Sequence, residues 1–419
     1  MTTTIAQPTA PQERIQLLDI IRGFALLGIL LMNIEYFQRP MLAMSQGFNN
    51  EVSGLDYATA WVVFVFVQGK FYTMFSLLFG IGFVLFLERA TQKSASPHWL
   101  FLRRTLILAM FGGAHLVLVW TGDILLTYAV AGLWLLLFRH TAPSKLWKGG
   151  LLLIMVPIAM LWLAVVGIQA AANSSDGSSM ISDMLAQQQY TAALISQGEQ
   201  TYANAGFVEV MQYRLAEIAI LYDIGNFIFV LMTICGIMMI GASMTRIGLF
   251  TRPSEHRKTL QRMLIIGAFV GLPSALYTGI AGLNTNMTMP DHHTAWVFTL
   301  QSLANISLCL AYMAALALLF MHTSTVSRIL MHLAPAGRMA LTNYLAHSIV
   351  FTTLFYGYGF GLYGEFGRFS TTIMAFVLFA AQLAFSRWWL QRYQYGPLEW
   401  VWRSATYGKW QPLLRGTRR

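Results

Sequence analysis

The chain has 419 residues, of which 56% are hydrophobic and only 11% are charged, and its formal net charge is +10. Soluble globular proteins carry roughly 25% charged residues, so this composition excludes an ordinary soluble fold. The positive charge does not indicate nucleic-acid binding either, because the basic residues lie in short segments between apolar runs and form no basic patch interleaved with aromatics. We therefore predict an all-α polytopic membrane protein whose first partner is the lipid bilayer.

Apolar runs of the length needed to cross a bilayer as a helix, about 20 residues, recur along the chain. We predict about ten transmembrane helices, with both termini in the cytoplasm. The expected spans are 16–37, 69–88, 101–120, 122–139, 150–170, 224–245, 260–282, 295–321, 337–358 and 369–389. Two further apolar stretches, 57–67 and 206–221, could extend a span or lie at the interface.

The positions of Lys and Arg support this orientation. With the amino terminus inside, all but four of the 27 basic residues fall in cytoplasmic segments. The exceptions are Arg39, Lys70, Arg214 and Arg368. An excess of Lys and Arg in cytoplasmic loops is what sets the orientation of membrane proteins, and one wrongly divided span would destroy the asymmetry.

We expect one membrane domain over the whole chain. The sequence does not decide its oligomeric state, and a homo-oligomer is one of the alternatives. It would consist of a cytoplasmic tail at 1–15, a bundle at 16–390 and a basic cytoplasmic tail at 391–419. The longest outer segment, about 171–205, contains no Lys or Arg. It could be a flexible linker, an amphipathic cap or a gating loop, and composition does not decide among these.

Ionisable residues within a membrane span are costly, and they commonly mark a functional site. Asp19 and Arg22 in the first span are three residues apart and can pair on one helix face. Asn33 follows Arg22 by eleven residues, which places it on nearly the same stripe about 16 Å further along the axis. These side chains could form a structural ion pair and an interhelical hydrogen bond, or they could line a functional path.

His115 and Asp123 flank a predicted reversal of the chain at Gly122. Both should lie in the outer half of the membrane, on neighbouring helices. A histidine oriented by a carboxylate is a suitable general base. Alternatively, Asp123 could cap the following helix, and His115 could simply bond to a neighbour.

Three more polar residues are candidates for substrate binding. Lys70 could bind an anionic group, although we favour extension of its ammonium to the outer headgroups. Asn343 and His347 are four apart on one face of the ninth span, so they could line one cavity or merely link helices. We expect no metal site, because the Asp291–His293 tract has the character of a solvated loop.

Several ordered motifs resemble those of the YeiB-like family of bacterial membrane proteins. They are Leu18-Asp19-Ile20-Ile21-Arg22-Gly23-Phe24 continuing to Asn33, Lys70-Phe71 with Phe75-Ser76-Leu77-Leu78-Phe79-Gly80, His115 with Gly122-Asp123-Ile124-Leu125, Gly337-Arg338-Met339-Ala340-Leu341-Thr342-Asn343-Tyr344-Leu345, and Tyr395-Gly396-Pro397-Leu398-Glu399-Trp400 with Trp402-Arg403. The resemblance covers nearly the whole chain and implies a multi-pass protein of the bacterial inner membrane.

The opening motif is also similar to that of transmembrane acyltransferases of the acyltransferase-three and heparan glucosaminide N-acetyltransferase types. This likeness implies transfer of an acyl group from cytoplasmic acyl-CoA, in particular acetyl-CoA, to an extracytoplasmic acceptor such as a glycan. In the acyltransferase-three pattern a catalytic His follows the Arg by eleven residues, where this chain has Asn33. The glucosaminide type has a His in the following loop, but residues 38–56 contain none.

The implied donor site would use Arg22 and Arg338 for the CoA phosphates, with Asp19 beside Arg22. His115 would then be the replacement base, oriented by Asp123 or Asn33. Two other hypotheses remain open: a transporter or exporter of a small molecule, and a membrane scaffold or sensor without chemistry.

Overall fold

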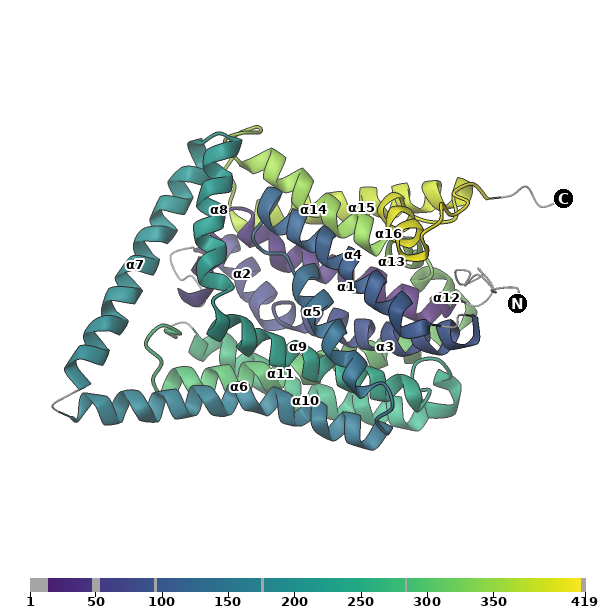
Figure 1. Ribbon diagram of the computed structural model, residues 1–419, viewed down its shortest axis with the longest axis horizontal. Helices are drawn as coiled ribbons and strands as arrows, with labels where there is room; N and C mark the ends of the chain where they lie inside the picture. The colour runs from purple at the N-terminus through teal and green to yellow at the C-terminus, as the bar shows by residue number, and fades with distance from the viewer. Residues whose placement is uncertain (1–13, 47–52, 94–95, 175–176, 283–284, 416–419) are drawn as a thin grey trace.

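The computed structural model describes residues 14–46, 53–93, 96–174, 177–282 and 285–415. Over these residues the chain is helical apart from turns and an isolated β-bridge between Tyr393 and Leu414 (Figure 1). The longer helices are α1 (Gln16–Tyr36), α2 (Gly54–Phe66), α3 (Lys70–Lys93), α4 (Pro97–Leu118), α5 (Leu125–Leu135), α6 (Pro143–Ala172), α7 (Gly177–Asn204), α8 (Phe207–Leu221), α9 (Ile224–Arg246), α10 (Arg257–Ala281), α11 (His292–Phe320), α14 (Ala340–Phe355), α15 (Arg368–Arg392) and α16 (Pro397–Tyr407). The short ones are η2 (Met41–Gln46), η3 (Leu136–Phe138), η4 (Pro253–His256), α12 (Ser324–Leu330) and α13 (Ala334–Arg338).

Each predicted span coincides with a helix of the structure. In the described part of the chain, eight helices are long and apolar enough to cross a membrane. The fourth predicted span corresponds to the shorter α5 with η3, and the ninth corresponds to α13 and α14. The expected all-α membrane bundle is therefore confirmed.

The helices differ in how much of their surface the protein itself covers. The most apolar window of α1 is 78% buried, whereas those of α6 and α15 are only 28% buried. Peripheral helices expose large apolar side chains, such as Leu163 at 70% and Phe269 at 80%. This arrangement suits lipid as the surrounding solvent, so the chain is a multi-pass membrane protein with α1 at its centre.

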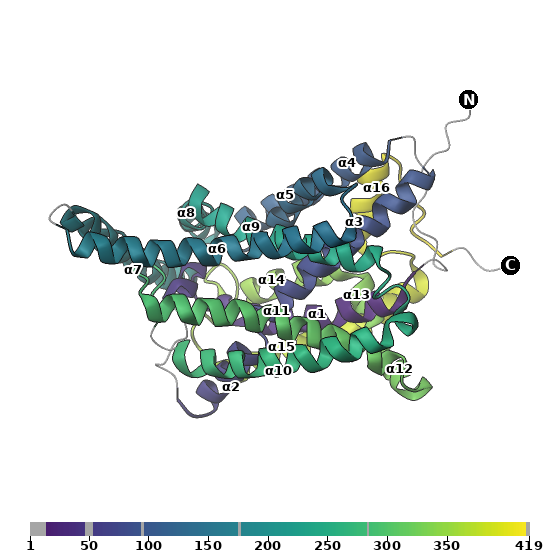
Figure 2. The same cartoon turned by 90° about the horizontal axis from the view of Figure 1, so that it is seen from below.

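Different helices lie at the two ends of the bundle. The beginning of α1 lies with α12, α13 and α16 at one end, and α7 and α8 lie at the other (Figures 1 and 2). The first end carries the arginines that the sequence assigns to the cytoplasm. The outer segment at about 171–205 is therefore largely a helix, α7, which with α6 and α8 forms an outer arm (Figure 1).

Close packing fixes α13 against the beginning of α1. A Cβ atom on Gly23 would overlap the backbone carbonyl of Leu333, and one on Gly337 would overlap that of Asp19. Small residues let helix backbones approach in this way within membranes. The contact brings Arg338, the residue after Gly337, next to the Asp19–Arg22 turn of α1.

Candidate functional site

A cavity of about 330 Å³ lies at the end of the bundle that carries α13 and α16. Its walls come from α1, α3, α4, α5, α13, α14 and α16. Six arginines line it: Arg14, Arg22, Arg89, Arg104, Arg338 and Arg403. Only two carboxylates accompany them along this lining, Asp19 and Glu399, so the charge balance favours an anionic ligand.

The acidic residue of α1 organises two of these arginines. Arg22 donates to Asp19 at 2.9 Å, and the guanidinium of Arg14 lies 3.9 Å from the same carboxylate. The side chain of Arg22 is still 29% exposed. The predicted pairing of Asp19 with Arg22 is therefore present, and it orients a cation that also lines the cavity.

The C-terminal helix α16 forms one wall of the cavity. Glu399 accepts hydrogen bonds from the backbone N–H and the hydroxyl of Thr342 at 3.0 and 2.6 Å, which joins α16 to α14. The Trp402 indole donates to the backbone carbonyl of Arg104 at 2.9 Å, and the Arg104 guanidinium lies 3.8 Å from the indole ring centroid. From its sequence, this region was expected to be only a basic cytoplasmic tail, so its place in the cavity wall is a finding of the structure.

Burial changes the acid–base properties of two groups on α16. It raises the pKa of the Glu399 carboxyl above its ordinary value, although the hydrogen bonds from Thr342 act in the opposite direction. Burial, followed by the nearby charge of Arg14, lowers the pKa of the Arg403 guanidinium. Arginine starts from so high a pKa that it stays a cation in proteins.

Part of the cavity lining is apolar and comes from the middle of α1 and α4. Ile29 and Leu108 line it. On α1, Asn33 follows Ile29 by one helical turn on the same face, and on α4, His115 follows Leu108 by two turns. Asn33 is only 4% exposed, and its side-chain amide forms no hydrogen bond within the described part of the chain.

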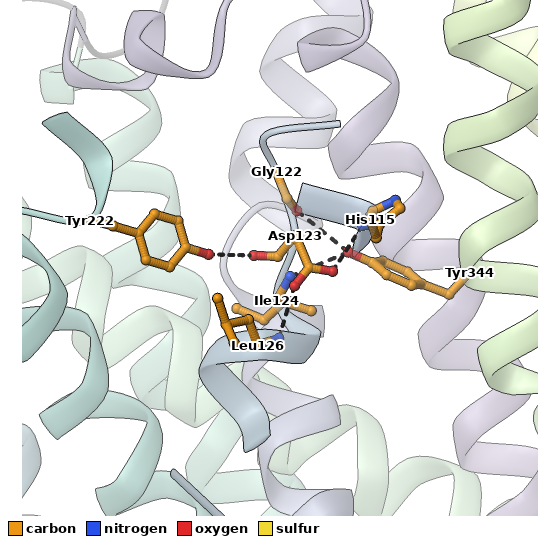
Figure 3. Close-up of polar contacts among 7 residues, drawn as sticks. All are labelled: His115, Gly122, Asp123, Ile124, Leu126, Tyr222 and Tyr344. Carbon is orange, nitrogen blue, oxygen red and sulfur yellow. Dashed lines mark hydrogen bonds and ion pairs between the residues drawn. The ribbon is translucent and has the colours of Figure 1, made fainter. Parts of the chain in front are cut away.

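His115 and Asp123 form a buried pair at the turn between α4 and α5 (Figure 3). The His115 Nδ1 atom lies 2.8 Å from one oxygen of Asp123, and the other oxygen accepts from the Leu126 N–H at 2.8 Å. Asp123 therefore orients the histidine and also accepts a hydrogen bond from a free backbone N–H at the start of α5. The His115 Nε2 atom is buried and has no partner among the described residues. A histidine held in this way can act as a general base through Nε2.

Tyr344 lies beside this pair (Figure 3). It lines the cavity, and its ring centroid lies 5.4 Å from that of His115. Its hydroxyl donates to the Gly122 carbonyl and accepts from the Ile124 N–H, each at 3.4 Å. Such long bonds are weak. Tyr344 was not among the predicted site residues, although it directly follows Asn343, which was.

Trp120 joins the end of α1 to the same turn. Its indole donates to the Tyr36 carbonyl at 3.2 Å. Its ring centroid lies 4.4 Å from that of Phe37 and 6.4 Å from that of His115. The end of α1, which carries Asn33, therefore packs against the segment that carries His115.

The remaining predicted site residues lie away from the cavity lining. Lys70 is fully buried, and its ammonium donates to the Phe64 carbonyl at 3.3 Å. The expectation that it extends to the headgroups is wrong, because α2 and α3 enclose it. His347 bonds to Gln382 at 2.7 Å, and Asn343 donates to Ser386 at 3.1 Å. Both side chains therefore link α14 to α15.

Comparison with known proteins identifies relatives along the whole chain. Residues 244–409 match the family described as a protein of unknown function, DUF418. The chain is 31% identical to the uncharacterized protein YxaH of Bacillus subtilis, over 98% of this chain and 99% of that protein. It is 30% identical to the uncharacterized protein YeiB of Escherichia coli, over 97% and 100% of the two chains. The chain belongs to the YeiB-like family.

A third relative is the uncharacterized 39.9 kDa protein in the amylase 3′ region of Bacillus acidopullulyticus, 29% identical over 97% of this chain and 98% of that protein. The DUF418 match includes Arg338, Tyr344, Glu399 and Arg403, which line the cavity from α13 to α16. The full-length matches also include α1 to α5, which supply Arg22 and the His115–Asp123 pair.

Proposed function

We propose that this protein is a transmembrane acyltransferase of the bacterial inner membrane, which moves an acyl group from cytoplasmic acyl-CoA to an extracytoplasmic acceptor such as a glycan. The observation that carries the proposal is the arginine-lined cavity whose inner wall, Tyr344, lies beside His115. The basic lining would bind an anionic nucleotide, and the apolar lining would contact a neutral thioester arm.

The arginines supply charge-assisted hydrogen bonds to phosphate oxygens. Arg22, Ile29 and Asn33 lie along one side of α1, with about 16 Å between the first and the last. This stripe would guide the extended arm of acetyl-CoA from the cytoplasmic end toward the turn between α4 and α5. Acetyl is the donor group we favour, because the opening motif resembles that of the heparan glucosaminide N-acetyltransferase type.

In the proposed reaction, His115 Nε2 takes the proton from a hydroxyl or amine of the acceptor. The oxygen or nitrogen forms a bond to the acyl carbon, the carbon–sulfur bond breaks, and the departing sulfur receives the proton from His115. Asp123 holds the imidazole in the tautomer that leaves Nε2 free. The Asn33 amide would donate a hydrogen bond to the oxygen that gains negative charge.

The first test is calorimetric titration of acetyl-CoA into the detergent-purified full-length protein. We expect saturable binding to the wild type, binding weakened about 10- to 100-fold in Arg22→Ala because a charged hydrogen-bond donor is lost, and unchanged binding in His115→Ala. Arg252→Ala is the matched control, since that arginine lies in an exposed ion pair with Glu255.

Absence of binding by folded wild-type protein, with longer acyl-CoAs tested as well, would overturn the acyltransferase proposal. It would favour the transporter hypothesis, in which the same basic cavity admits a small anion.

A further inference from the structure

A second buried polar cluster lies on the outer side of the turn that carries His115 and Asp123. It consists of Arg214 and Glu217 from α8, Tyr202 from α7, and Tyr356 and Tyr363 from the segment between α14 and α15. We call these five residues the outer cluster. α7 and α8 lie at the end of the molecule opposite α16 (Figure 1), so the outer cluster and the arginine-lined cavity belong to opposite sides of the membrane.

Two contacts join the outer cluster to the turn between α4 and α5. The Arg214 Nη1 atom donates to the Val117 carbonyl at 3.2 Å. The Tyr202 hydroxyl lies 3.4 Å from that of Thr121. Val117 and Thr121 both fall between His115 and Asp123 in the chain, so the outer cluster packs directly against the segment that holds the proposed base.

The charge of Arg214 is incompletely satisfied. Its side chain is 0% exposed, and its Nε and Nη2 atoms have no hydrogen-bond partner among the described residues. Glu217 lies one turn further along α8, but its two oxygens accept from the Leu42 N–H at 3.1 Å and the Tyr202 hydroxyl at 2.9 Å. Leaving a buried cation without a matched anion is costly, and such groups in membrane proteins commonly serve function.

A group of three tyrosine rings lies on one side of this guanidinium, with Tyr356 next to it. Arg214 lies 5.8 Å from the ring centroid of Tyr356, which stacks on Tyr202 at 4.5 Å. The Tyr363 ring lies 6.1 Å from both of these rings, and its hydroxyl is buried without a partner in the described chain. The guanidinium and the phenol hydroxyl both have hydrogen-bond donors without acceptors, and stacked aromatic rings lie next to them. Such a cluster suits an oxyanion that is attached to a cyclic molecule.

We propose that the outer cluster is the acceptor site, and that it binds an anionic oxygen group, a carboxylate or a phosphate, on the acceptor. Arg214 and Tyr363 donate hydrogen bonds to this group. The acceptor is then held against the segment between His115 and Asp123, where its hydroxyl or amine meets the base. The assignment of the bound molecule as an acceptor rests on the proposed acyl transfer, but binding of the anion does not.

The test measures thermal unfolding of the purified full-length protein with D-glucuronate, inorganic phosphate or neutral D-glucose. Binding to the native state raises the unfolding temperature. We expect a rise with at least one of the two anions and none with glucose, and the anion that acts identifies a carboxylate or a phosphate. Arg214→Met should weaken anion binding about 10- to 100-fold.

Two variants show whether the anion binds at the outer cluster or elsewhere on the protein. Tyr363→Phe removes only an unpartnered hydroxyl, so it should leave the ligand-free unfolding temperature unchanged or higher while weakening anion binding. Arg22→Ala should keep the rise that binding at the outer cluster causes, and any phosphate response that Arg22→Ala removes belongs to the arginine-lined cavity. A wild-type protein that responds to neither anion, or an Arg214→Met protein that responds as the wild type does, would overturn the acceptor site.

Acetyl-CoA binding gives an independent readout. It should persist in Arg214→Met, which also shows that this variant is folded. A wild type that binds acetyl-CoA but responds to neither anion would refute the outer site alone, whereas an anion response without any acetyl-CoA binding would refute the acyltransferase function alone.

Discussion

At the scale of single residues, Asp123 has two roles that can be separated. One carboxylate oxygen contacts His115 and the other accepts from the Leu126 N–H. The capping role needs only an acceptor, which asparagine also provides. The orienting role needs a group that accepts a hydrogen bond from the Nδ1–H of His115. An asparagine amide can present its own N–H groups there instead.

We therefore expect Asp123→Asn to reduce acyl transfer about 10²- to 10⁴-fold, a range typical of losing general-base catalysis, while acetyl-CoA binding and the unfolding temperature change little. Transfer of radiolabelled acetate, together with thermal unfolding, checks both parts. Asp223→Asn is the matched control, because Asp223 caps α9 through the Gly225 N–H and contacts no histidine in the described structure. Full activity in Asp123→Asn would rule out His115 as a base oriented by this carboxylate.

Individual residues also differ in how well their positions could be predicted from the sequence. The Asp19–Arg22 and His115–Asp123 pairs were predictable because short separations along the chain determine them. The position of Lys70 was not, because its burial depends on α2, which ends only four residues before it and could not be assigned with certainty. Tyr344 carries no charge, so its presence in the Gly337–Leu345 motif did not indicate that it lines the cavity beside His115.

At the scale of elements, a buried carboxyl group helps to attach α16 to α14. Both oxygens of Glu399 accept hydrogen bonds from Thr342, and burial raises the pKa of this carboxyl from its ordinary value of 4.5. A group whose pKa is raised on folding contributes stability below its unfolded pKa, and this contribution is lost as the pH rises through the folded value.

The wild type should accordingly gain stability relative to Glu399→Gln as the pH falls from neutrality toward 4.5. Thermal unfolding of both proteins over that range measures the difference. Glu255→Gln provides the control, because the side chain of Glu255 is 55% exposed and its exposed ion pair contributes little. A difference between wild type and Glu399→Gln that is constant with pH would show that the carboxyl does not titrate differently in the folded state.

The helices themselves were predictable, but the cavity was not. Ten apolar runs and the asymmetry of basic residues predict the spans, since lipid imposes both patterns directly. The cavity wall depends on the contact between Trp402 and Arg104, which lie 298 residues apart in the chain. No periodic pattern specifies such a contact, so α16 could be placed only by the three-dimensional packing.

At the scale of the whole molecule, the two polar regions should be reachable from opposite sides of the membrane. Ser182 is exposed on α7, and Ser324 is exposed at the start of α12 at the other end. The native Cys235 and Cys309 are buried, at 3% and 0% exposure, so they should contribute little background to thiol labelling.

In intact cells with a permeable outer envelope, we expect a membrane-impermeant maleimide to label Ser182→Cys and not Ser324→Cys. Disruption of the inner membrane should then make Ser324→Cys reactive. The two substitutions are chemically identical, so each serves as the control for the other. The reverse labelling pattern would invert the orientation, and with it the assignment of donor and acceptor sides.

The last described residues are held beside α16 by hydrogen bonds and ring stacking, which has a practical consequence for the preparation of this protein. Backbone groups of Leu413 and Arg415 bond back to Gln394 and Arg392, and Trp410 stacks on Trp400 with ring centroids 5.0 Å apart. A purification tag or fluorescent fusion attached at the carboxyl terminus would therefore follow shortly after a segment that is bonded to Arg392 and stacked on α16. Such fusions should be cleaved before ligand affinities are compared, because bulk beside Trp410 and Arg415 can disturb the packing of α16, whose residues line the cavity.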